Sequence, residues 1–264
     1  MDERVAAPRA ELHADARLAL ACLDLTSLND ADDDAAIDAL IARAAGGVGR
    51  PAAWCVWPRF VGRARAALPR EVAVAAVANF PVGALDVQRA LADTKSIVDA
   101  GGDEVDLVLP WRAMLGGEAP AAARLVAAVR AACPGQRLKL IIESGELPLP
   151  ETIRQACRIG LEAGVDFLKT STGKTAHGAS LEAARLMLEQ IAAQSRPVGF
   201  KASGGIRTVA DAAGYIALVT EILGAAAAHP LRLRFGASGL LADIERVLAG
   251  TPAAAAAAAE AAGY

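Results

Sequence analysis

Aromatic residues are scarce in this chain. They make up only 4% of its 264 residues, although hydrophobic residues make up 54%. The core must therefore consist mainly of Ala, Val, Leu and Ile, which suit buried parallel strands covered by Ala-rich helices. No proline-rich or serine-rich linker interrupts the sequence, so we expect one domain.

The chain also lacks sustained basic or apolar runs. Its formal net charge is -3, which argues against nucleic acid or an anionic membrane as the main partner. No stretch approaches the roughly 20 uninterrupted apolar residues of a membrane-spanning helix. The N-terminus is charged and polar, without the apolar centre of a signal peptide. We therefore expect a cytoplasmic protein.

Cysteine and histidine are few and scattered. The four cysteines form no CxxC motif and show no framework spacing, as expected for reduced thiols. The three histidines are far apart and form no HxxxH pair, so the sequence gives little support for a histidine-rich metal site. We expect neither a metal nor a cofactor.

Short apolar runs alternate with longer Ala-rich amphipathic stretches, a pattern typical of parallel α/β folds. The predicted strands cover residues 21–26, 52–58, 72–80, 103–110, 138–145, 165–171, 198–203 and 233–238. Eight strand–helix units in about 250 residues match the usual size of a (β/α)8 TIM barrel. We expect this barrel over residues 1–250 and an Ala-rich tail over residues 251–264. An open doubly wound sheet is the alternative, because periodicity alone does not show closure.

Reactive groups of such barrels sit where strands end and the following loops begin. The polar residues at the predicted strand ends are Asp24, Asn79, Asp106, Glu143, Lys169 and Lys201. The two lysines are the most informative, because they interrupt apolar strands about one strand–helix repeat apart. Lysine is rarely buried without a partner, since desolvating an ammonium is costly.

Chemistry gives one reason for such a lysine pair. An amine with a pKa near 10.4 is protonated at pH 7 and cannot attack a carbonyl. A second ammonium about 4 Å away adds about 4 kcal/mol of repulsion at an effective dielectric near 20, and burial acts in the same direction. One lysine would then become nucleophilic. The alternatives are salt-bridged lysines, and an Asp106 that holds a loop instead of moving protons or pairing with Lys201.

Glycine-rich loops after the last two predicted strands indicate a phosphate site. TIM barrels commonly bind phosphate there through backbone N–H groups and a helix N-terminus. Glycines after strands are often only turn residues, so their coincidence in two loops carries the prediction. The residues concerned are Gly204, Gly205, Gly236, Ser238 and Gly239, with the segment STGK at 171–174 one loop earlier.

The sequence resembles the deoxyribose-phosphate aldolase family over almost its whole length. The motifs that carry this resemblance are LDLTSLND (23–30), WPRF (57–60), NFPVG (79–83), DEVDLVLPWRA (103–113), IIESGEL (141–147), FLKTSTGK (167–174), GFKASGGIR (199–207), RFGAS (234–238) and the final Tyr264. The resemblance implies a class I aldolase, a lyase of deoxyribonucleotide catabolism. It would reversibly cleave 2-deoxy-D-ribose 5-phosphate to acetaldehyde and D-glyceraldehyde 3-phosphate.

The resemblance also implies roles for individual residues. Lys169 would form the Schiff base, Lys201 would lower its pKa, and Asp106 would move protons together with Lys201 and water. Tyr264 would enter the site and assist proton exchange at the enamine carbon. The residues expected to hold the substrate phosphate are Lys174, Gly204, Gly205, Gly236 and Ser238. A homodimer fits the family.

The chain departs from the family pattern at a few positions near the site. Ala202-Ser203 replaces a common Pro-Ala, Gly239 replaces a common serine, and Trp111 replaces a frequent tyrosine. None of these changes removes a reacting group. Two other functions stay open on the residues alone: a phosphate-binding isomerase or epimerase with Glu143 or Asp106 as base, and a sugar-phosphate-binding protein without turnover.

Overall fold

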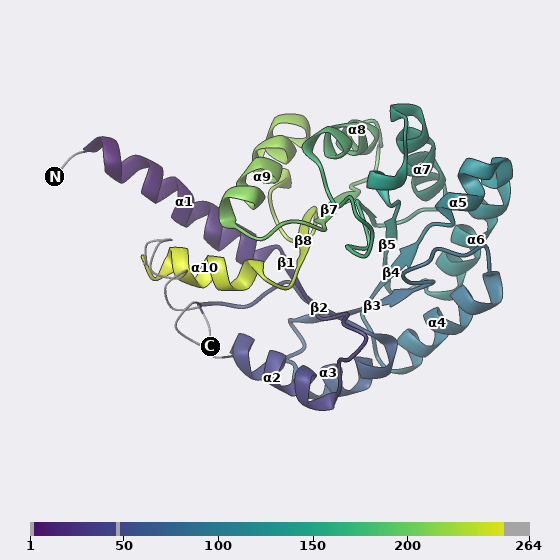
Figure 1. Ribbon diagram of the computed structural model, residues 1–264, viewed down its shortest axis with the longest axis horizontal. Helices are drawn as coiled ribbons and strands as arrows, with labels where there is room; N and C mark the ends of the chain where they lie inside the picture. The colour runs from purple at the N-terminus through teal and green to yellow at the C-terminus, as the bar shows by residue number, and fades with distance from the viewer. Residues whose placement is uncertain (1–2, 46–47, 251–264) are drawn as a thin grey trace.

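Eight parallel strands form a closed barrel in the computed structural model, which describes residues 3–45 and 48–250 (Figure 1). Neighbouring strands pair in chain order, and the last strand pairs with the first. The strands are β1 (Leu23–Thr26), β2 (Ala53–Val56), β3 (Ala73–Ala78), β4 (Glu104–Val108), β5 (Arg137–Ile141), β6 (Phe167–Lys169), β7 (Gly199–Ser203) and β8 (Leu233–Ala237). This closure confirms the predicted TIM barrel and excludes the open sheet.

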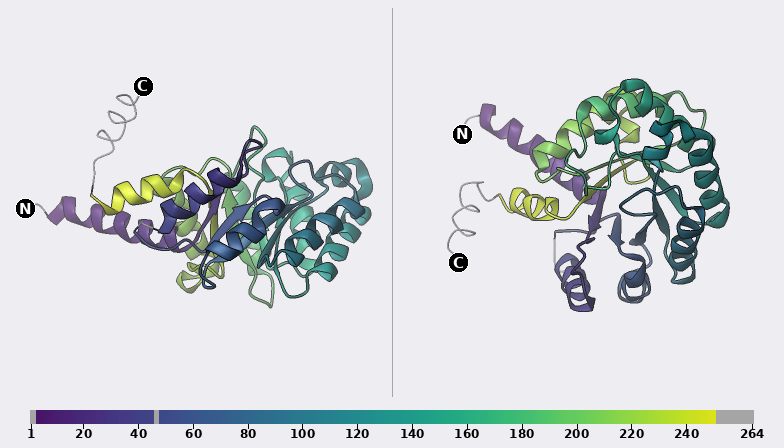
Figure 2. Two further views of the ribbon diagram at one scale, coloured as in Figure 1. Left: turned by 90° about the horizontal axis from the view of Figure 1, so that it is seen from below. Right: turned by 45° about the vertical axis from the view of Figure 1, so that its right-hand side comes forward.

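The helices surround the barrel and follow the strands in the expected order (Figures 1 and 2). They are α2 (Asp34–Ala45), α3 (Val61–Ala67), α4 (Val87–Asp99), the short α5 (Trp111–Ala113), α6 (Ala119–Ala132), α7 (Pro150–Glu162), α8 (Leu181–Ala192), α9 (Val209–Leu223) and α10 (Leu240–Leu248). An additional helix, α1 (Glu3–Ala21), precedes the barrel and packs against α9 and α10. None of the helices in the described ranges is long and apolar enough to span a membrane.

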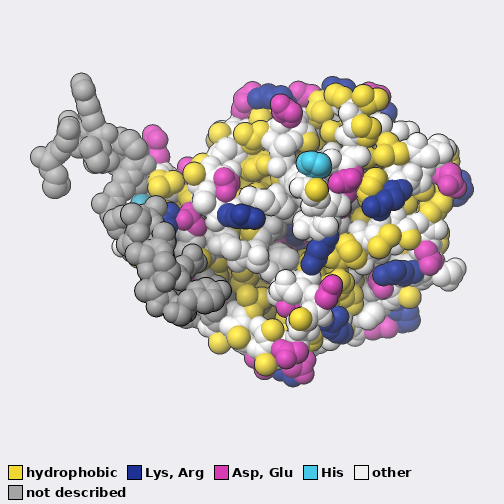
Figure 3. Space-filling model, in the orientation of Figure 1, with side chains coloured by type: hydrophobic (Ala, Val, Ile, Leu, Met, Phe, Trp, Pro, Cys, Tyr) yellow, Lys and Arg dark blue, Asp and Glu magenta, His cyan; other side chains and the backbone are white. Residues whose placement is uncertain are grey.

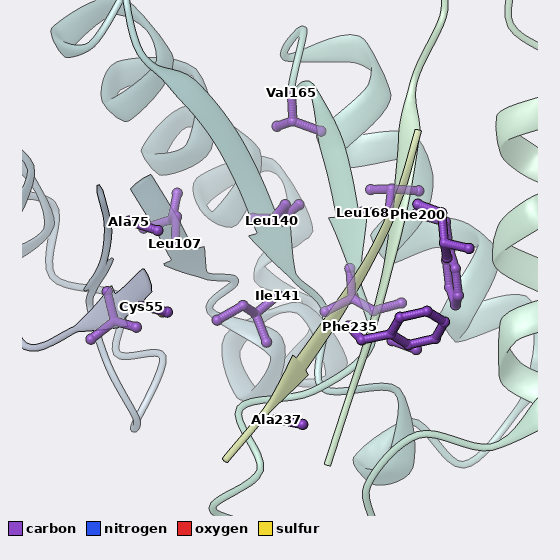
Figure 4. Close-up of a cluster of buried hydrophobic side chains, with 14 of the residues drawn as sticks. Cys55, Ala75, Leu107, Leu140, Ile141, Val165, Leu168, Phe200, Phe235 and Ala237 are labelled. Carbon is purple, nitrogen blue, oxygen red and sulfur yellow. The ribbon is translucent and has the colours of Figure 1, made fainter. Parts of the chain in front are cut away.

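Side chains alternate along the strands between two environments. Leu107, Leu140, Leu168, Phe200 and Phe235 are buried members of the hydrophobic core, and Figure 4 labels them on their strands. Each is next in sequence to a buried charged residue on the same strand. Because successive residues of a strand point to opposite faces, the apolar set packs toward the helices and the charged set fills the barrel. The alternation thus places charge at the barrel centre.

Every predicted strand exists, but all eight are shorter than predicted. The third, for example, ends at Ala78, and Asn79 already belongs to the following loop with φ 55°. The sixth ends at Lys169, which leaves Thr170 and Ser171 to the next loop. The polar residues at strand ends are therefore loop residues in several cases, which is where barrels place their sites. Residues 251–264, with the predicted tail and Tyr264, lie outside the described residues.

Charges of both signs are mixed on the face seen in Figure 3, without a large area of one sign. This distribution agrees with the small net charge of -3. A nucleic-acid-binding face would carry basic side chains gathered in one patch. The charges that matter for chemistry lie inside the barrel instead.

Candidate active site

Lys169 and Lys201 face each other across neighbouring strands. Lys169 ends β6 and Lys201 is the third residue of β7, and the two are direct partners in the strand register. Both are buried, with 2% and 0% of their surface exposed. The predicted placement of the two lysines at equivalent points of neighbouring strands is therefore confirmed.

Asp106 on β4 binds both lysines through one oxygen. Its Oδ2 accepts hydrogen bonds from Lys169 Nζ at 2.9 Å and from Lys201 Nζ at 2.8 Å. Its Oδ1 accepts from Lys139 Nζ, also at 2.9 Å. Asp106 therefore pairs with Lys201, which is one of the roles considered for it in the sequence analysis. The same carboxylate also lies beside Lys169, so it could exchange a proton with that amine.

The two lysines differ in how their surroundings affect the pKa. Burial lowers the pKa of Lys169, and nearby Lys201 acts in the same direction, which together outweigh the attraction of Asp106. Burial also acts against the charged form of Lys201, but two carboxylates, Asp106 and Asp24, raise its pKa above the ordinary value. Lys201 therefore stays an ammonium, and Lys169 becomes the amine that loses its proton more easily.

The difference follows from the number of carboxylates that each lysine contacts. Lys201 Nζ is 2.5 Å from Asp24 Oδ2 in addition to its contact with Asp106. For Lys169, Asp106 is the one carboxylate within salt-bridge distance among the described residues. Because a partner charge favours the ionised form, the lysine with two carboxylates keeps its proton.

Three buried charged residues in this cluster were not among the predicted site residues. Lys139 on β5 donates to Asp24 at 3.0 Å and lies 2.5 Å from Glu104 Oε2. Arg234 on β8 donates to Asp24 at 2.5 Å and to Glu104 at 2.9 Å. The sequence signal was available, because each interrupts an apolar strand as Lys169 does. Lys139 also lies about one strand–helix repeat before Lys169.

A cavity of about 400 Å³ opens beside Lys169 at the end of the barrel where the strands lead into their loops. It brings together Lys169 and all the residues predicted to hold phosphate: Lys174, Gly204, Gly205, Gly236 and Ser238. Arg207 also lines it, although it was not among the predicted phosphate residues. Lys201 and Lys139 are not among its lining residues, so within the buried cluster Lys169 is the amine that a ligand in the cavity meets.

The cavity has several groups suited to an anion. Gly239 lines it and precedes α10, whose N-terminus has no side-chain cap. Backbone N–H groups at such a helix end attract phosphate. Lys174 adds a cation, and its Nζ also donates to the carbonyl of Leu28 at 2.7 Å. A phosphate bound by these groups would lie in the same cavity as the Lys169 amine.

Two of these glycines, Gly204 in the loop after β7 and Gly236 in β8, have no room for a side chain. A Cβ on Gly204, which has a φ of 86°, would lie 2.6 Å from Ser171 Oγ. A Cβ on Gly236 would lie 2.8 Å from Cβ of Ser203. Close packing therefore requires glycine at both positions: at Gly204 it brings the loops after β6 and β7 together, and at Gly236 it packs β8 against the end of β7.

Ser203, one of the departures from the family pattern, connects the loops after β6 and β7. Its hydroxyl donates to the carbonyl of Ser171 at 2.5 Å, and its own carbonyl accepts from Ser171 Oγ at 2.6 Å. Thr170 Oγ1 donates to the same carbonyl at 3.0 Å. These bonds fix the chain directly after both lysines.

The other strand-end residues have supporting positions. Glu143 has a φ of 54°, and its Oε1 accepts from the backbone N–H of Thr172 at 3.1 Å, which holds the loop that carries Lys174. Burial raises the pKa of Glu143. Asn79 donates from Nδ2 to the carbonyl of Ala84 at 2.8 Å and so fixes the loop after β3. Neither residue lines the cavity.

Cys55 lies at the third position of β2 and is fully buried. Burial and the nearby carboxylate of Asp106 raise the pKa of its thiol above the ordinary value. A thiol in this state is a poor nucleophile, because the thiolate is the reactive form.

Comparison with known proteins agrees with the geometry. Residues 18–243 match the model of the DeoC/LacD family aldolases. A deoxyribose-phosphate aldolase of Agrobacterium fabrum (strain C58 / ATCC 33970) is 46% identical over 238 residues, which are 89% of this chain and 92% of that protein.

Solved structures show the same fold. A structure from Toxoplasma gondii ME49 superposes with a TM-score of 0.83 at 21% identity, covering 94% of this chain and 98% of the other. A tetrameric deoxyribose phosphate aldolase from Aeropyrum pernix superposes with a TM-score of 0.68 at 24% identity, covering 93% and 98%. Together with the matching family model, the barrel and its lysine pair identify this chain as a member of the DeoC/LacD family of aldolases.

Proposed function

We propose that this aldolase reversibly cleaves 2-deoxy-D-ribose 5-phosphate to acetaldehyde and D-glyceraldehyde 3-phosphate through a Schiff base on Lys169. The observation that carries the proposal is the position of Lys169. It belongs to the buried cluster of charged residues, and it also lines the cavity whose walls include the glycine-rich loops and Lys174. A phosphorylated sugar bound there would present its carbonyl carbon to an amine with a lowered pKa.

The reaction begins with attack of neutral Lys169 on C1 of the open-chain sugar. The carbinolamine loses water and becomes a protonated imine, which withdraws electrons from the neighbouring bond. A base removes the proton of the C3 hydroxyl, the C2–C3 bond breaks, and its electron pair forms an enamine. D-Glyceraldehyde 3-phosphate leaves with the new carbonyl at the former C3.

Return to the free enzyme needs a proton and water. Protonation of the enamine carbon gives the imine of acetaldehyde, and water hydrolyses it to acetaldehyde and the amine of Lys169. We infer that Asp106 takes part in these transfers, which the contacts of its Oδ2 with both Lys169 and Lys201 support. Tyr264 would assist the protonation of the enamine carbon, as the family resemblance implies. We also infer the phosphate contacts from Lys174, Gly204, Gly205, Gly236 and Ser238.

The proposed cellular location, substrates and oligomeric state follow from the same interpretation. The four cysteines are free and buried, which suits the reducing cytoplasm. The substrates are a phosphosugar and small aldehydes. A homodimer is part of the proposal, and sedimentation equilibrium of the full chain tests it.

The direct test of the function is release of acetaldehyde from 2-deoxy-D-ribose 5-phosphate, followed by coupled reduction of the aldehyde. We expect turnover by the wild-type chain and none by Lys169→Ala. Retention of near-normal activity by the variant would contradict the assignment of Lys169. Ligand binding without release of acetaldehyde by the wild type would favour the isomerase or the non-catalytic interpretation.

A further inference from the structure

A second layer of charge lies beneath the reacting groups, deeper in the barrel. Glu104 is on β4 two residues before Asp106, so both side chains point to the same face of the strand. Arg234 is the register partner of Lys201 on β8. Neither Glu104 nor Arg234 lines the cavity, and their exposed fractions are 0% and 2%.

The two layers are connected by short contacts. Arg234 reaches Asp24 Oδ1 at 2.5 Å with one nitrogen and Glu104 Oε1 at 2.9 Å with the other. Lys139 lies 2.5 Å from Glu104 Oε2 and 2.9 Å from Asp106 Oδ1. A continuous chain of ion pairs therefore runs from Arg234 to Asp106, and Asp106 contacts Lys169.

The fully buried charges of this ion-paired cluster balance when Lys169 is neutral; Arg137, which pairs with Glu104 from the partly exposed edge, is left out of this count. Its carboxylates are Asp24, Glu104 and Asp106, and its other basic groups are Lys139, Lys201 and Arg234. These six charges cancel, so a proton on Lys169 would leave one uncompensated positive charge inside the barrel. An uncompensated buried charge is costly.

We propose that Glu104 and Arg234 are positioning residues that set the charge balance of the barrel interior and thereby the pH range in which Lys169 is a free amine: Arg234 favours the neutral amine, and Glu104 opposes it. This inference rests on the proposed function, because it assigns Lys169 as the reacting amine. It goes beyond that function, because neither residue meets the cavity. The two act through the charges between them and Lys169.

The groups that face Lys169 come from several strands and stay in place in the test below. They are Asp106 on β4, Lys201 on β7, Cys55 on β2 and Glu143 in the loop after β5. Lys139 reaches Lys169 through Asp106. Arg137, whose side chain is 31% exposed, contacts Glu104 at 2.5 Å from the edge of the cluster. A change at Glu104 or Arg234 alters one charge and leaves this set otherwise intact.

The expected size of the shift follows from the distance between the altered charge and Lys169. Glu104 on β4 and Arg234 on β8 are each two strands away from Lys169 on β6, and neighbouring strands lie about 4.8 Å apart, which gives a separation of roughly 10 Å. One unit charge at that distance, in a medium with an effective dielectric near 20, shifts a titration by about one pH unit or slightly more. Such a shift is measurable in the acid limb of kcat/KM, which reports the groups of the free enzyme.

The test compares variants that remove a charge with variants that keep it. Glu104→Gln removes a negative charge, disfavours the ammonium of Lys169 and is expected to move the acid limb about one unit to lower pH. Arg234→Met removes a positive charge, favours the ammonium and is expected to move the limb by a similar amount to higher pH. Glu104→Asp and Arg234→Lys keep the charges, so their limbs should stay near that of the wild type.

A purely structural role would lower stability in all four variants without shifting the limb in opposite directions. Thermal unfolding of each variant identifies any that fail to fold. Arg137→Met is the milder substitute for Arg234→Met, because it removes a positive charge from a partly exposed side chain. Its limb should move to higher pH by less than one unit.

The outcomes separate this inference from the proposed function. If the wild type releases no acetaldehyde, the proposed function fails and this inference fails with it. If the wild type is active but Glu104→Gln and the arginine variants leave the limb unmoved, or move it in one direction, only the inference is overturned. Opposite shifts that the charge-keeping variants do not show would support it.

Discussion

Lys169 and Lys201 are direct partners across the β6–β7 ladder and share one oxygen of Asp106, yet their pKa values move in opposite directions. The second carboxylate of Lys201, Asp24, accounts for the difference. Two lysines in nearly the same position thus differ in how readily each loses its proton. Lys169 loses its proton more easily than an ordinary lysine, and Lys201 holds its proton more strongly.

Removing Lys201 should change both rate and pH dependence. Lys201→Met takes away a cation that lowers the pKa of Lys169, while Asp106 remains and raises it. The pKa of Lys169 then rises, so the acid limb of kcat/KM should move to higher pH. Loss of proton transfer should lower kcat about 10² to 10⁴-fold. A pH–rate profile measures both effects, and an unshifted limb would contradict the charge relation.

Lys169→Met should abolish turnover without destabilising the fold. The folded-state pKa of Lys169 lies below its unfolded value, so at pH 7 the amine opposes folding, and that effect fades as the pH rises. Methionine has a similar length and no charge, and Asp106 keeps Lys201 and Lys139 as donors. We expect an equal or higher free energy of unfolding in urea at pH 7. A loss greater than about 2 kcal/mol would show that Lys169 is chiefly structural.

Gly204→Ala should weaken binding of the phosphorylated substrate. The new Cβ would meet Ser171 Oγ at 2.6 Å, and the φ of 86° is unfavourable for alanine. We expect about a tenfold increase in KM from a strain of about 1–3 kcal/mol. Gly62→Ala on α3 is the matched control, because nothing lies within 4 Å of its Cβ. Equal effects of the two changes on KM would argue against a phosphate loop at Gly204.

Lys174→Met should discriminate between phosphorylated and unphosphorylated substrates. Loss of a charge-assisted contact costs about 1.5–3 kcal/mol, so KM for 2-deoxy-D-ribose 5-phosphate should rise roughly 10 to 100-fold. KM for unphosphorylated 2-deoxy-D-ribose should stay within about twofold. Lys95→Met, which removes a lysine that is 74% exposed and paired with Asp99 on α4, should change neither. A parallel rise for both sugars would place the phosphate elsewhere.

The fold was predictable because strand and helix periods repeat eight times in one chain. Closure was not, since the pairing of β8 with β1 joins segments from opposite ends of the sequence. The strands were also predicted to be too long. Residues such as Asn79 and Thr170 directly follow an apolar run in the sequence, but in the structure they belong to the loop after the strand. The local sequence pattern predicts the alternation of strands and helices, whereas tertiary contacts determine where each strand ends.

The site was predictable where a charged residue interrupts an apolar strand at its middle or its end. Lys169, Lys201 and Asp106 meet that criterion and come together at hydrogen-bond distance. Glu104 and Arg234 also interrupt apolar strands, but they lie deeper in the barrel. Their contacts depend on how strands β1, β4 and β8 are staggered, which the sequence does not state. The ion-pair partners therefore needed coordinates.

The most direct test of the central claim is to trap the imine. The full chain is incubated with 2-deoxy-D-ribose 5-phosphate or acetaldehyde, reduced with borohydride, digested, and mapped by peptide mass spectrometry. The account predicts an added mass on Lys169 and none on Lys201, Lys139 or Lys174. An adduct on Lys201 would reverse the roles of the two lysines, and no adduct on a folded, ligand-binding chain would contradict the Schiff-base mechanism.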